Sequence, residues 1–183
     1  ALIALALPIV LSGAMHEDGL ADTADGLWGG WTRARRLEIM KDSHIGSYGV
    51  IALILSLGAR GVALWLLYEA GPATATVAIL AAALSSRAMM PLVMCALPHA
   101  RANGLSQAQG RPPLATALLG LAIAVALTLG LVGAAGMSAL IAAGIVTCAM
   151  TLVARAKIGG QTGDILGATQ QLTEITVLFS LLA

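Results

Sequence analysis

Residues 16–26 read His-Glu-Asp-Gly-Leu-Ala-Asp-Thr-Ala-Asp-Gly and hold four of the nine carboxylates in the chain. In a helix, Asp18, Asp22 and Asp25 would lie on one face, at positions i, i+4 and i+7. Three carboxylates on one face repel one another unless a positive partner lies between them. Mg²⁺ prefers such oxygen ligands and often binds substrate phosphates as well. We therefore predict a Mg²⁺ site here; the alternative is a solvated loop whose acids pair with nearby arginines. His16 could add a ligand or a base, although a single histidine is more often only hydrogen-bonded.

Segment 33–47 alternates basic and acidic residues, which predicts a short helix at a membrane interface. Arginine and lysine bind phosphate, and arginine can do so with two parallel hydrogen bonds. Arg36 and Lys41 are therefore candidate phosphate ligands, and Asp42 would add a carboxylate to the acidic site. The alternative is a helix whose long basic side chains face lipid headgroups.

The segment 159–167 reads Gly-Gly-Gln-Thr-Gly-Asp-Ile-Leu-Gly. Glycine-rich loops that open a helix can present backbone N–H groups to phosphate. The segment lacks the Gly-Lys-Ser/Thr of a Walker A loop. We take its polar and glycine residues as candidate substrate ligands, the alternative being a flexible connection between helices. These candidates are Gly160, Thr162, Gly163 and Asp164.

The composition indicates an integral membrane protein. Hydrophobic residues make up 58% of the chain and charged residues only 10%, whereas a soluble domain has about 25% charged residues. Long apolar runs predict an all-α, polytopic membrane helix bundle that forms a single domain over residues 1–183. A net charge of +1 gives no reason to expect a nucleic-acid partner. The many small residues permit close helix packing and a homodimer.

The pattern of apolar runs predicts four complete spans and a last helix that does not fully cross. The spans are 48–68, 74–97, 114–132 and 137–154, and the last helix is 169–183. The loops 13–47, 98–113 and 155–168 carry four, two and two basic residues, and the connections 69–73 and 133–136 carry none. Loops alternate sides, so the basic loops share one face, which the positive-inside rule places in the cytoplasm. Residues 1–12 resemble the end of a membrane helix, so we expect an N-terminal segment to be missing.

Two arginines interrupt the predicted spans. A charged residue at the centre of a span costs at least about 2.5 kcal/mol, so it normally faces a partner or a wet cavity. No acid lies within the four spans, so the partners of Arg60 and Arg87 are expected to come from the loops. Arg87 could instead reach an anionic substrate.

Four motifs together resemble the cobalamin synthase family, the adenosylcobinamide-GDP ribazoletransferases. They are residues 16–26, Arg36-Leu-Glu-Ile-Met-Lys-Asp-Ser43 with Ile45-Gly46, Leu84-Ser-Ser-Arg87, and residues 159–168. The match runs in the family's order over nearly the whole chain. It implies a Mg²⁺-dependent enzyme of the bacterial inner membrane, with its active-site loops on the cytoplasmic face. The reaction implied joins adenosylcobinamide-GDP to α-ribazole, or to its 5′-phosphate, and releases GMP.

This chemistry suggests a role for each candidate residue. Asp18, Asp22 and Asp25 would ligate Mg²⁺, and Glu17 or Asp42 would act as a further ligand or as the base. Arg36, Lys41 and Arg87 would hold phosphates, and the loop from Gly159 to Asp164 would cradle the guanosine pyrophosphate or a second metal. Two alternatives stay open: an enzyme like the CDP-alcohol phosphotransferases, whose acids are spaced differently, and an anion transporter lined by Arg60 and Arg87.

Overall fold

The computed structural model describes residues 1–183 and is all-helical, with no β-strand. Its elements are α1 (Leu2–Ser12), α2 (Met15–Gly29), α3 (Arg33–Ile39), α4 (Ser47–Ala70), α5 (Pro72–Ala96), α6 (Leu105–Gln109), α7 (Leu114–Val132), α8 (Ala135–Ile158) and α9 (Gly163–Ser180). The predicted fold class, a helical bundle with membrane-spanning helices, is confirmed.

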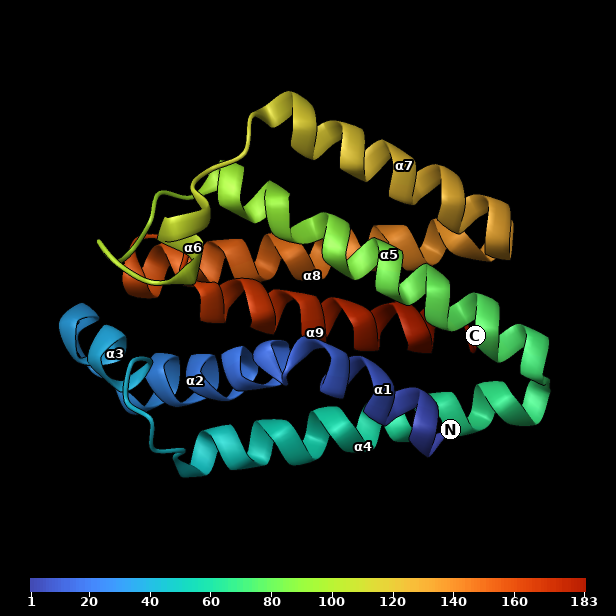
Figure 1. The fold of residues 1–183 in the computed structure, drawn as a ribbon, viewed down its shortest axis with the longest axis horizontal. Helices are drawn as coiled ribbons and strands as arrows, with labels where there is room; N and C mark the ends of the chain where they lie inside the picture. Colours follow the sequence, from blue (N-terminus) through green and yellow to red (C-terminus); the bar gives the residue numbers. More distant parts are fainter.

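Four helices are long and apolar enough to cross a membrane: α4, α5, α7 and α8. They correspond to the four predicted spans. The short helices α3 and α6 lie at one end of the bundle together with the polar loops, and the α4–α5 and α7–α8 connections lie at the opposite end (Figure 1). The polar segments therefore gather at a single end of the molecule, as the charge pattern predicts.

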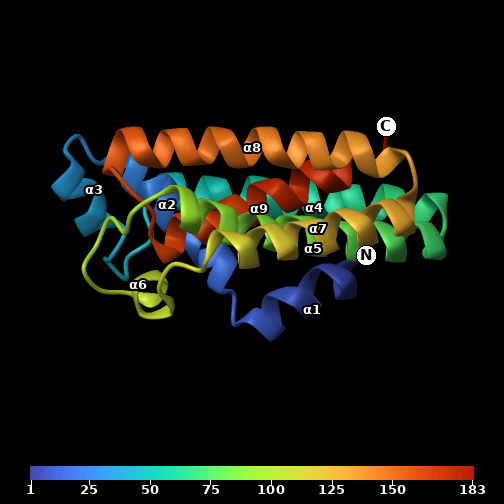
Figure 2. The ribbon, with the colours of Figure 1, turned by 90° about the horizontal axis from the view of Figure 1, so that it is seen from above.

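The chain turns sharply between α1 and α2, which are bent by 84°. Two consecutive residues in the left-handed conformation make this turn, Gly13 at φ 63° and Ala14 at φ 58°. Glycine adopts this conformation freely, whereas alanine pays about 1–2 kcal/mol for it. The turn leaves α1 on the outside of the bundle (Figure 2) and directs the acidic helix α2 inward against α9 and α4.

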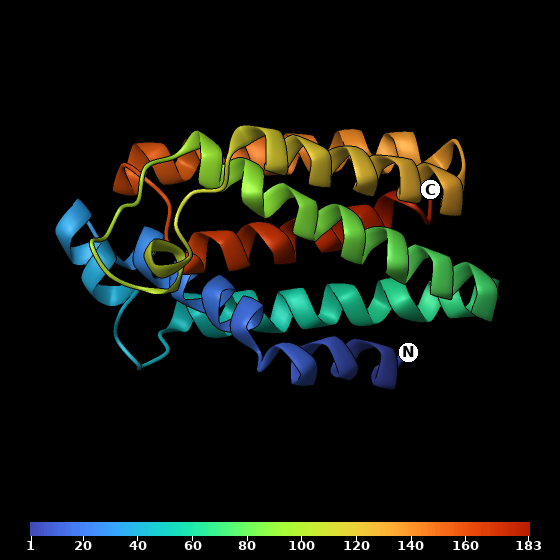
Figure 3. The ribbon, with the colours of Figure 1, turned by 45° about the horizontal axis from the view of Figure 1, so that its top comes forward.

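Helix α9 is the central helix of the bundle and packs against α2, α4, α5 and α8 (Figure 3). It is also unusually polar for a buried helix, because Thr169, Gln170, Gln171 and Thr173 are all buried. Buried polar side chains need hydrogen-bond partners. The sequence predicts a last helix that does not fully cross the membrane. In the structure this helix, α9, forms the polar core around which the other helices are arranged.

The predicted interfacial helix over 33–47 is shorter than expected, because α3 ends at Ile39. Beyond it, the Asp42 side chain accepts a hydrogen bond from the His44 backbone N–H at 3.2 Å. Such a local bond competes with helix formation. The remaining residues form an irregular connection that leads to Gly46, the residue before α4.

Candidate active site

The acidic stretch is helical, as predicted, and it faces the start of α9. The carboxylates of Asp18, Asp25 and Asp164 all lie close enough to Asp22 to repel its negative charge. Asp164 belongs to the glycine-rich segment, so two of the four sequence motifs meet here. Helix α2 supplies three of these acids from one face, and the N-terminus of α9 supplies the fourth.

Two glycines allow this meeting. A Cβ on Gly19 would lie 3.0 Å from the Asp164 carbonyl oxygen, and a Cβ on Gly167 would lie 3.2 Å from the His16 carbonyl oxygen. Both distances are tighter than an ordinary Cβ contact, so the backbones of α2 and α9 cross in close contact. This close approach sets the separation between the acids of the two helices.

Asp25 is already engaged with the start of α4. Its carboxylate accepts hydrogen bonds from the backbone N–H of Gly46 at 2.7 Å and of Gly49 at 2.9 Å. A Cβ on either glycine would collide with this carboxylate, at 2.5 Å and 2.4 Å. A carboxylate stabilises the positive N-terminal end of a helix dipole. Asp25 therefore positions α2 against α4, and its two oxygens already have partners.

Asp164 forms an ion pair with Arg101, and the Thr162 hydroxyl donates a hydrogen bond to it at 3.1 Å. Burial raises the pKa of Asp164 above its usual range, against the opposing effect of Arg101. Thr162 also caps α9 by accepting a hydrogen bond from the Ile165 N–H. Arg101 is thus the one cation in contact with the carboxylate cluster.

A cavity of about 400 Å³ opens beside these groups. Asp18, Asp164, Thr162 and Gly163 line one part of it, together with His16. The loop that leads from α5 to α6 lines another part, through His99, Arg101 and the segment 103–107. Its volume lies toward the small end of the range for ligand pockets, about 300–1,000 Å³.

The donor set suits a hard divalent cation. Asp18 and Asp22 carry carboxylates that repel each other, and no hydrogen bond or ion pair engages either side chain within the protein. No three His, Cys, Asp or Glu side chains are arranged to hold a metal ion among themselves. Mg²⁺ commonly binds through one or two carboxylates, keeping several waters and substrate phosphates as the other ligands. The pair Asp18 and Asp22 fits that mode.

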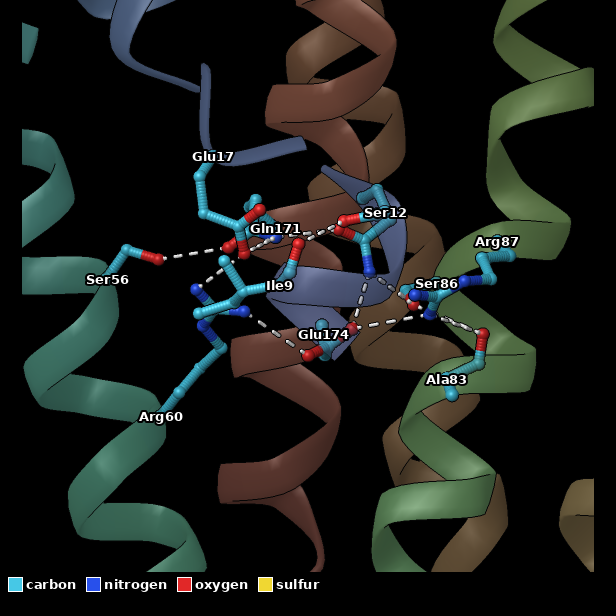
Figure 4. A network of polar contacts seen from close by, with 11 residues as sticks. Ile9, Ser12, Glu17, Ser56, Arg60, Ala83, Ser86, Arg87, Gln171 and Glu174 are labelled. Atoms are coloured by element: carbon cyan, nitrogen blue, oxygen red, sulfur yellow. Dashed lines mark hydrogen bonds and ion pairs between the residues drawn. The ribbon is translucent and has the colours of Figure 1, made fainter. Parts of the chain in front are cut away.

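Glu17 points the other way, into a network of buried charges (Figure 4). It accepts hydrogen bonds from Arg60 at 3.0 Å and from Gln171 at 3.1 Å. Arg60 also lies 3.6 Å from Glu174, and both arginine and glutamate are largely excluded from solvent. The prediction that the partners of Arg60 come from loops is confirmed for Glu17, which lies in the predicted loop 13–47, and is wrong for Glu174, which lies on the last helix, α9. Helix α2 enters the bundle and brings Glu17 to the level of the span.

Arg87 completes this network from α5. Its guanidinium lies 3.5 Å from Glu174 and donates to the Ala83 carbonyl at 3.3 Å. The side chain is 41% exposed, so it retains free donors. It lies outside the lining of the cavity, although it is near enough to His16 to influence that ring electrostatically. Two arginines here balance two glutamates.

Three further predicted site residues, Arg36, Lys41 and Asp42, also lie away from the cavity. Arg36 donates to the carbonyls of Gly30 at 2.9 Å and Lys157 at 3.0 Å, and so ties the α2–α3 turn to the end of α8. Lys41 is exposed on the connection after α3. Asp42 lies on the same connection and contacts His44, with 2.7 Å between its Oδ1 and the ring Nδ1.

The Asp42–His44 pair makes a testable pH prediction. The hydrogen bond raises the pKa of His44 and lowers the pKa of Asp42. The contact therefore stabilises the loop while Asp42 is ionised and His44 is protonated. It is lost as pH rises through the raised pKa of His44, or falls through the lowered pKa of Asp42. We expect an NMR titration to place His44 above 6.5 and Asp42→Asn to lower it; an unchanged value would contradict the pairing.

Gly160 is packed against backbone and does not line the cavity. A Cβ there would lie 2.4 Å from the Pro98 carbonyl oxygen and 2.9 Å from the Ala100 nitrogen. The structure gives this glycine a packing role, and the predicted contact with substrate stays untested.

We expect Gly160→Ala to lower the thermal unfolding temperature clearly, because backbone atoms cannot move aside as a flexible side chain can. Gly163→Ala is the matched control. Its Cβ would make ordinary contacts at 3.8 Å and 4.0 Å with Leu105 and Ser106, so its unfolding temperature should stay close to the wild-type value. Thermal unfolding of the purified protein in detergent measures both. Equal unfolding temperatures of the two variants would show that the backbone of residues 98–100 can move to make room for the added Cβ.

Sequence reasoning missed three residues of the site: His99, Arg101 and Gln161. Backbone hydrogen bonds join their two segments, from Ala100 N–H to Gln161 O and from Gln161 N–H to Pro98 O. His99 and Arg101 do lie within a predicted polar loop, but nothing in their spacing pairs that loop with the glycine-rich segment. Only the folded bundle places the two side by side.

Comparison with known proteins agrees with the sequence motifs. Residues 1–182 match the family described as cobalamin-5-phosphate synthase. A protein of Bradyrhizobium diazoefficiens named adenosylcobinamide-GDP ribazoletransferase is 48% identical over 179 residues, which cover 97% of this chain and 68% of that protein. One of the same name from Azorhizobium caulinodans is 47% identical over 190 residues, covering 100% of this chain and 71% of that protein. No solved structure matches the chain.

Proposed function

The chain belongs to the cobalamin-5-phosphate synthase family, and we propose on this basis that it joins adenosylcobinamide-GDP to α-ribazole or α-ribazole 5′-phosphate. A hydroxyl of the ribose attacks the phosphorus on the cobinamide side of the pyrophosphate. A new P–O bond forms, the bond to GMP breaks, and the hydroxyl proton is released. The product is adenosylcobalamin or its 5′-phosphate, and the reaction places the chain at the last assembly stage of cobalamin synthesis.

The observation that carries this proposal is the meeting of the acidic stretch 16–26 and the glycine-rich segment beside a cavity. Displacement at phosphorus depends mainly on positioning the reactants and on neutralising charge on the phosphoryl oxygens. The close contact of α2 and α9 fixes the separation between Asp18 and Asp164. Arg101 pairs with Asp164 at the cavity wall, where its remaining N–H groups can donate to phosphoryl oxygens.

Asp18 and Asp22 would hold Mg²⁺, with waters and substrate phosphates as its other ligands. When bound, the cation would neutralise charge on the phosphates and orient the pyrophosphate for attack. Asp25 supports this arrangement by fixing α2 on the N-terminus of α4. Glu17 anchors the other end of α2 through Arg60. We therefore assign these two acids to positioning α2.

The positive-inside rule supports a cytoplasmic location for the cavity, because every basic loop lies at its end of the bundle. We propose the bacterial inner membrane as the location. An anion transporter would concentrate polar residues at the bilayer midplane on broken helices. The buried network of Glu17 and Arg60 lies at the level of the spans, but its charges are paired with one another. The family membership favours the enzyme.

The test is a reconstituted assay with adenosylcobinamide-GDP and α-ribazole, in which GMP is quantified by chromatography. We expect GMP release to require both substrates and Mg²⁺, and to stop when EDTA removes the metal. Release of GMP without α-ribazole would indicate a hydrolase. Flux of substrate across liposomes without any product would indicate a transporter.

A further inference from the structure

The segment before α6 presents alternate residues to the cavity and to the core. Residues 98–100 pair with Gln161 in a short parallel bridge, through backbone hydrogen bonds of 2.9 Å and 2.8 Å. In extended backbone, successive side chains point to opposite sides. Ala100 is accordingly buried in a core cluster with Leu97 and Ile158, whereas His99 and Arg101 both line the cavity. Two nitrogen-bearing side chains thus share one wall.

The His99 ring is held by a buried amide. The Gln161 side chain is 1% exposed, and its Nε2 lies 2.9 Å from His99 Nδ1. The amide nitrogen is a donor, so Nδ1 must be the acceptor, and the proton of the neutral ring is on Nε2. The Ser106 hydroxyl donates to the amide oxygen of Gln161 and fixes the orientation of the amide.

The other ring nitrogen, Nε2, has no hydrogen-bond partner within the protein and belongs to a side chain that lines the cavity. A neutral N–H donor beside Arg101 suits an oxygen acceptor that carries negative charge. Asp18 and Asp164 also line the cavity, and Asp164 pairs with Arg101; both carboxylates repel any anion that lacks a cation between it and them. An incoming phosphate therefore gains most from the wall that carries His99 and Arg101.

We propose that His99 binds a phosphate oxygen of a substrate through its Nε2–H, and that Gln161 positions the ring by fixing this tautomer. The inference rests on the proposed function and extends it to a residue outside the acidic motifs. The phosphate has two candidate sources with the same chemistry: the pyrophosphate of adenosylcobinamide-GDP, and the 5′-phosphate of α-ribazole 5′-phosphate.

Steady-state kinetics with both acceptors separates these sources. A hydrogen bond to a charged group contributes enough that His99→Ala should raise the relevant KM by about ten-fold to a hundred-fold. His99→Gln places an amide N–H near the position of Nε2 and should recover most of that loss. If the KM of adenosylcobinamide-GDP rises both with α-ribazole and with α-ribazole 5′-phosphate as the acceptor, His99 binds the pyrophosphate. If only the KM of α-ribazole 5′-phosphate rises, His99 binds the acceptor phosphate.

Unchanged KM values for His99→Ala, with an active wild-type protein, would overturn the role of His99 and leave the proposed function standing. A wild-type protein that releases no GMP would instead overturn the proposed function, and this inference with it. His44→Ala is the matched control, because that ring is 89% exposed on a connection outside the cavity. We expect it to keep the wild-type KM for every substrate.

The positioning role of Gln161 is tested by the tautomer of His99, which a change in packing alone would not alter. The chain has only three histidines, so ¹⁵N-histidine NMR spectra can identify the tautomer of His99. We expect a protonated Nε2 in the wild type, a mixture of tautomers in Gln161→Ala, and a KM shift in the same direction as in His99→Ala. A wild-type ring protonated on Nδ1, or a Gln161→Ala variant with an unaltered tautomer, would overturn this assignment.

Discussion

Replacing Asp22 with asparagine is expected to lower GMP release at saturating Mg²⁺ by at least about a hundred-fold. Asp22 lies among the carboxylates of Asp18, Asp25 and Asp164, and a cation bound there would offset their repulsion. A catalytic metal contributes several kcal/mol, and about 1.4 kcal/mol corresponds to a factor of ten in rate. A Mg²⁺ titration of activity in membranes measures the effect, and we expect the half-saturating Mg²⁺ concentration to rise as well.

The asparagine variant should fold normally, because it removes a charge that its neighbours repel. Its thermal unfolding temperature is therefore expected to equal or exceed the wild-type value. Asp25→Asn is the matched comparison, because its carboxylate accepts two backbone N–H groups at the start of α4. We expect that variant to lose stability by about 1 kcal/mol. Near-wild-type activity of Asp22→Asn across the Mg²⁺ titration would remove the metal site from the proposal.

Replacing Arg60 with methionine is expected to cost the protein about 3–5 kcal/mol of its free energy of unfolding, the usual effect of removing one partner of a buried ion pair. Arg60 is 2% exposed and faces both Glu17 and Glu174 (Figure 4). Without it, Glu17 and Glu174 remain in a buried site, where Arg87 contacts only Glu174. Chemical unfolding in detergent, followed by tryptophan fluorescence, measures the loss.

Two further variants test this explanation. Arg87→Met removes a half-exposed partner that lies 3.5 Å from Glu174, so we expect a cost of only about 1 kcal/mol. The double variant Glu17→Gln, Arg60→Met removes one charge of each sign, and it should recover part of the stability lost in Arg60→Met. A double variant no more stable than Arg60→Met would mean that Arg60 acts through packing and not through charge.

The sequence determined the fold class and the shared end of the polar loops, because both depend on composition and on charge counts along the chain. An apolar run of 18 or more residues is typical of a membrane helix, and few other structures accommodate it. The basic residues of loops 13–47, 98–113 and 155–168 likewise predict one shared end, which the structure has (Figure 1). The spacing of Asp18, Asp22 and Asp25 predicted one helical face, since helical periodicity is a local property.

Tertiary structure alone decided which acid does what. Neighbouring residues on α2 point in different directions, so Glu17 enters the buried ion pair with Arg60 while Asp18 lines the cavity. Asp25 has the same side chain as Asp22, yet it caps α4, because Gly46 and Gly49 leave room for its carboxylate there. These differences follow from helix packing, which spacing along one helix cannot report.

The stretch 16–26, predicted to form a single metal and catalytic site, therefore contacts three parts of the bundle. Its first part anchors α2 through Glu17, its middle faces Asp164 through Asp18 and Asp22, and its end holds α4 through Asp25. The partner wall of the cavity comes from His99 and Arg101, about 75 residues further along the chain. The sequence identified the acids as candidates, and only the close crossing of α2 and α9 at Gly19 and Gly167 brings Asp18 and Asp164 to one cavity.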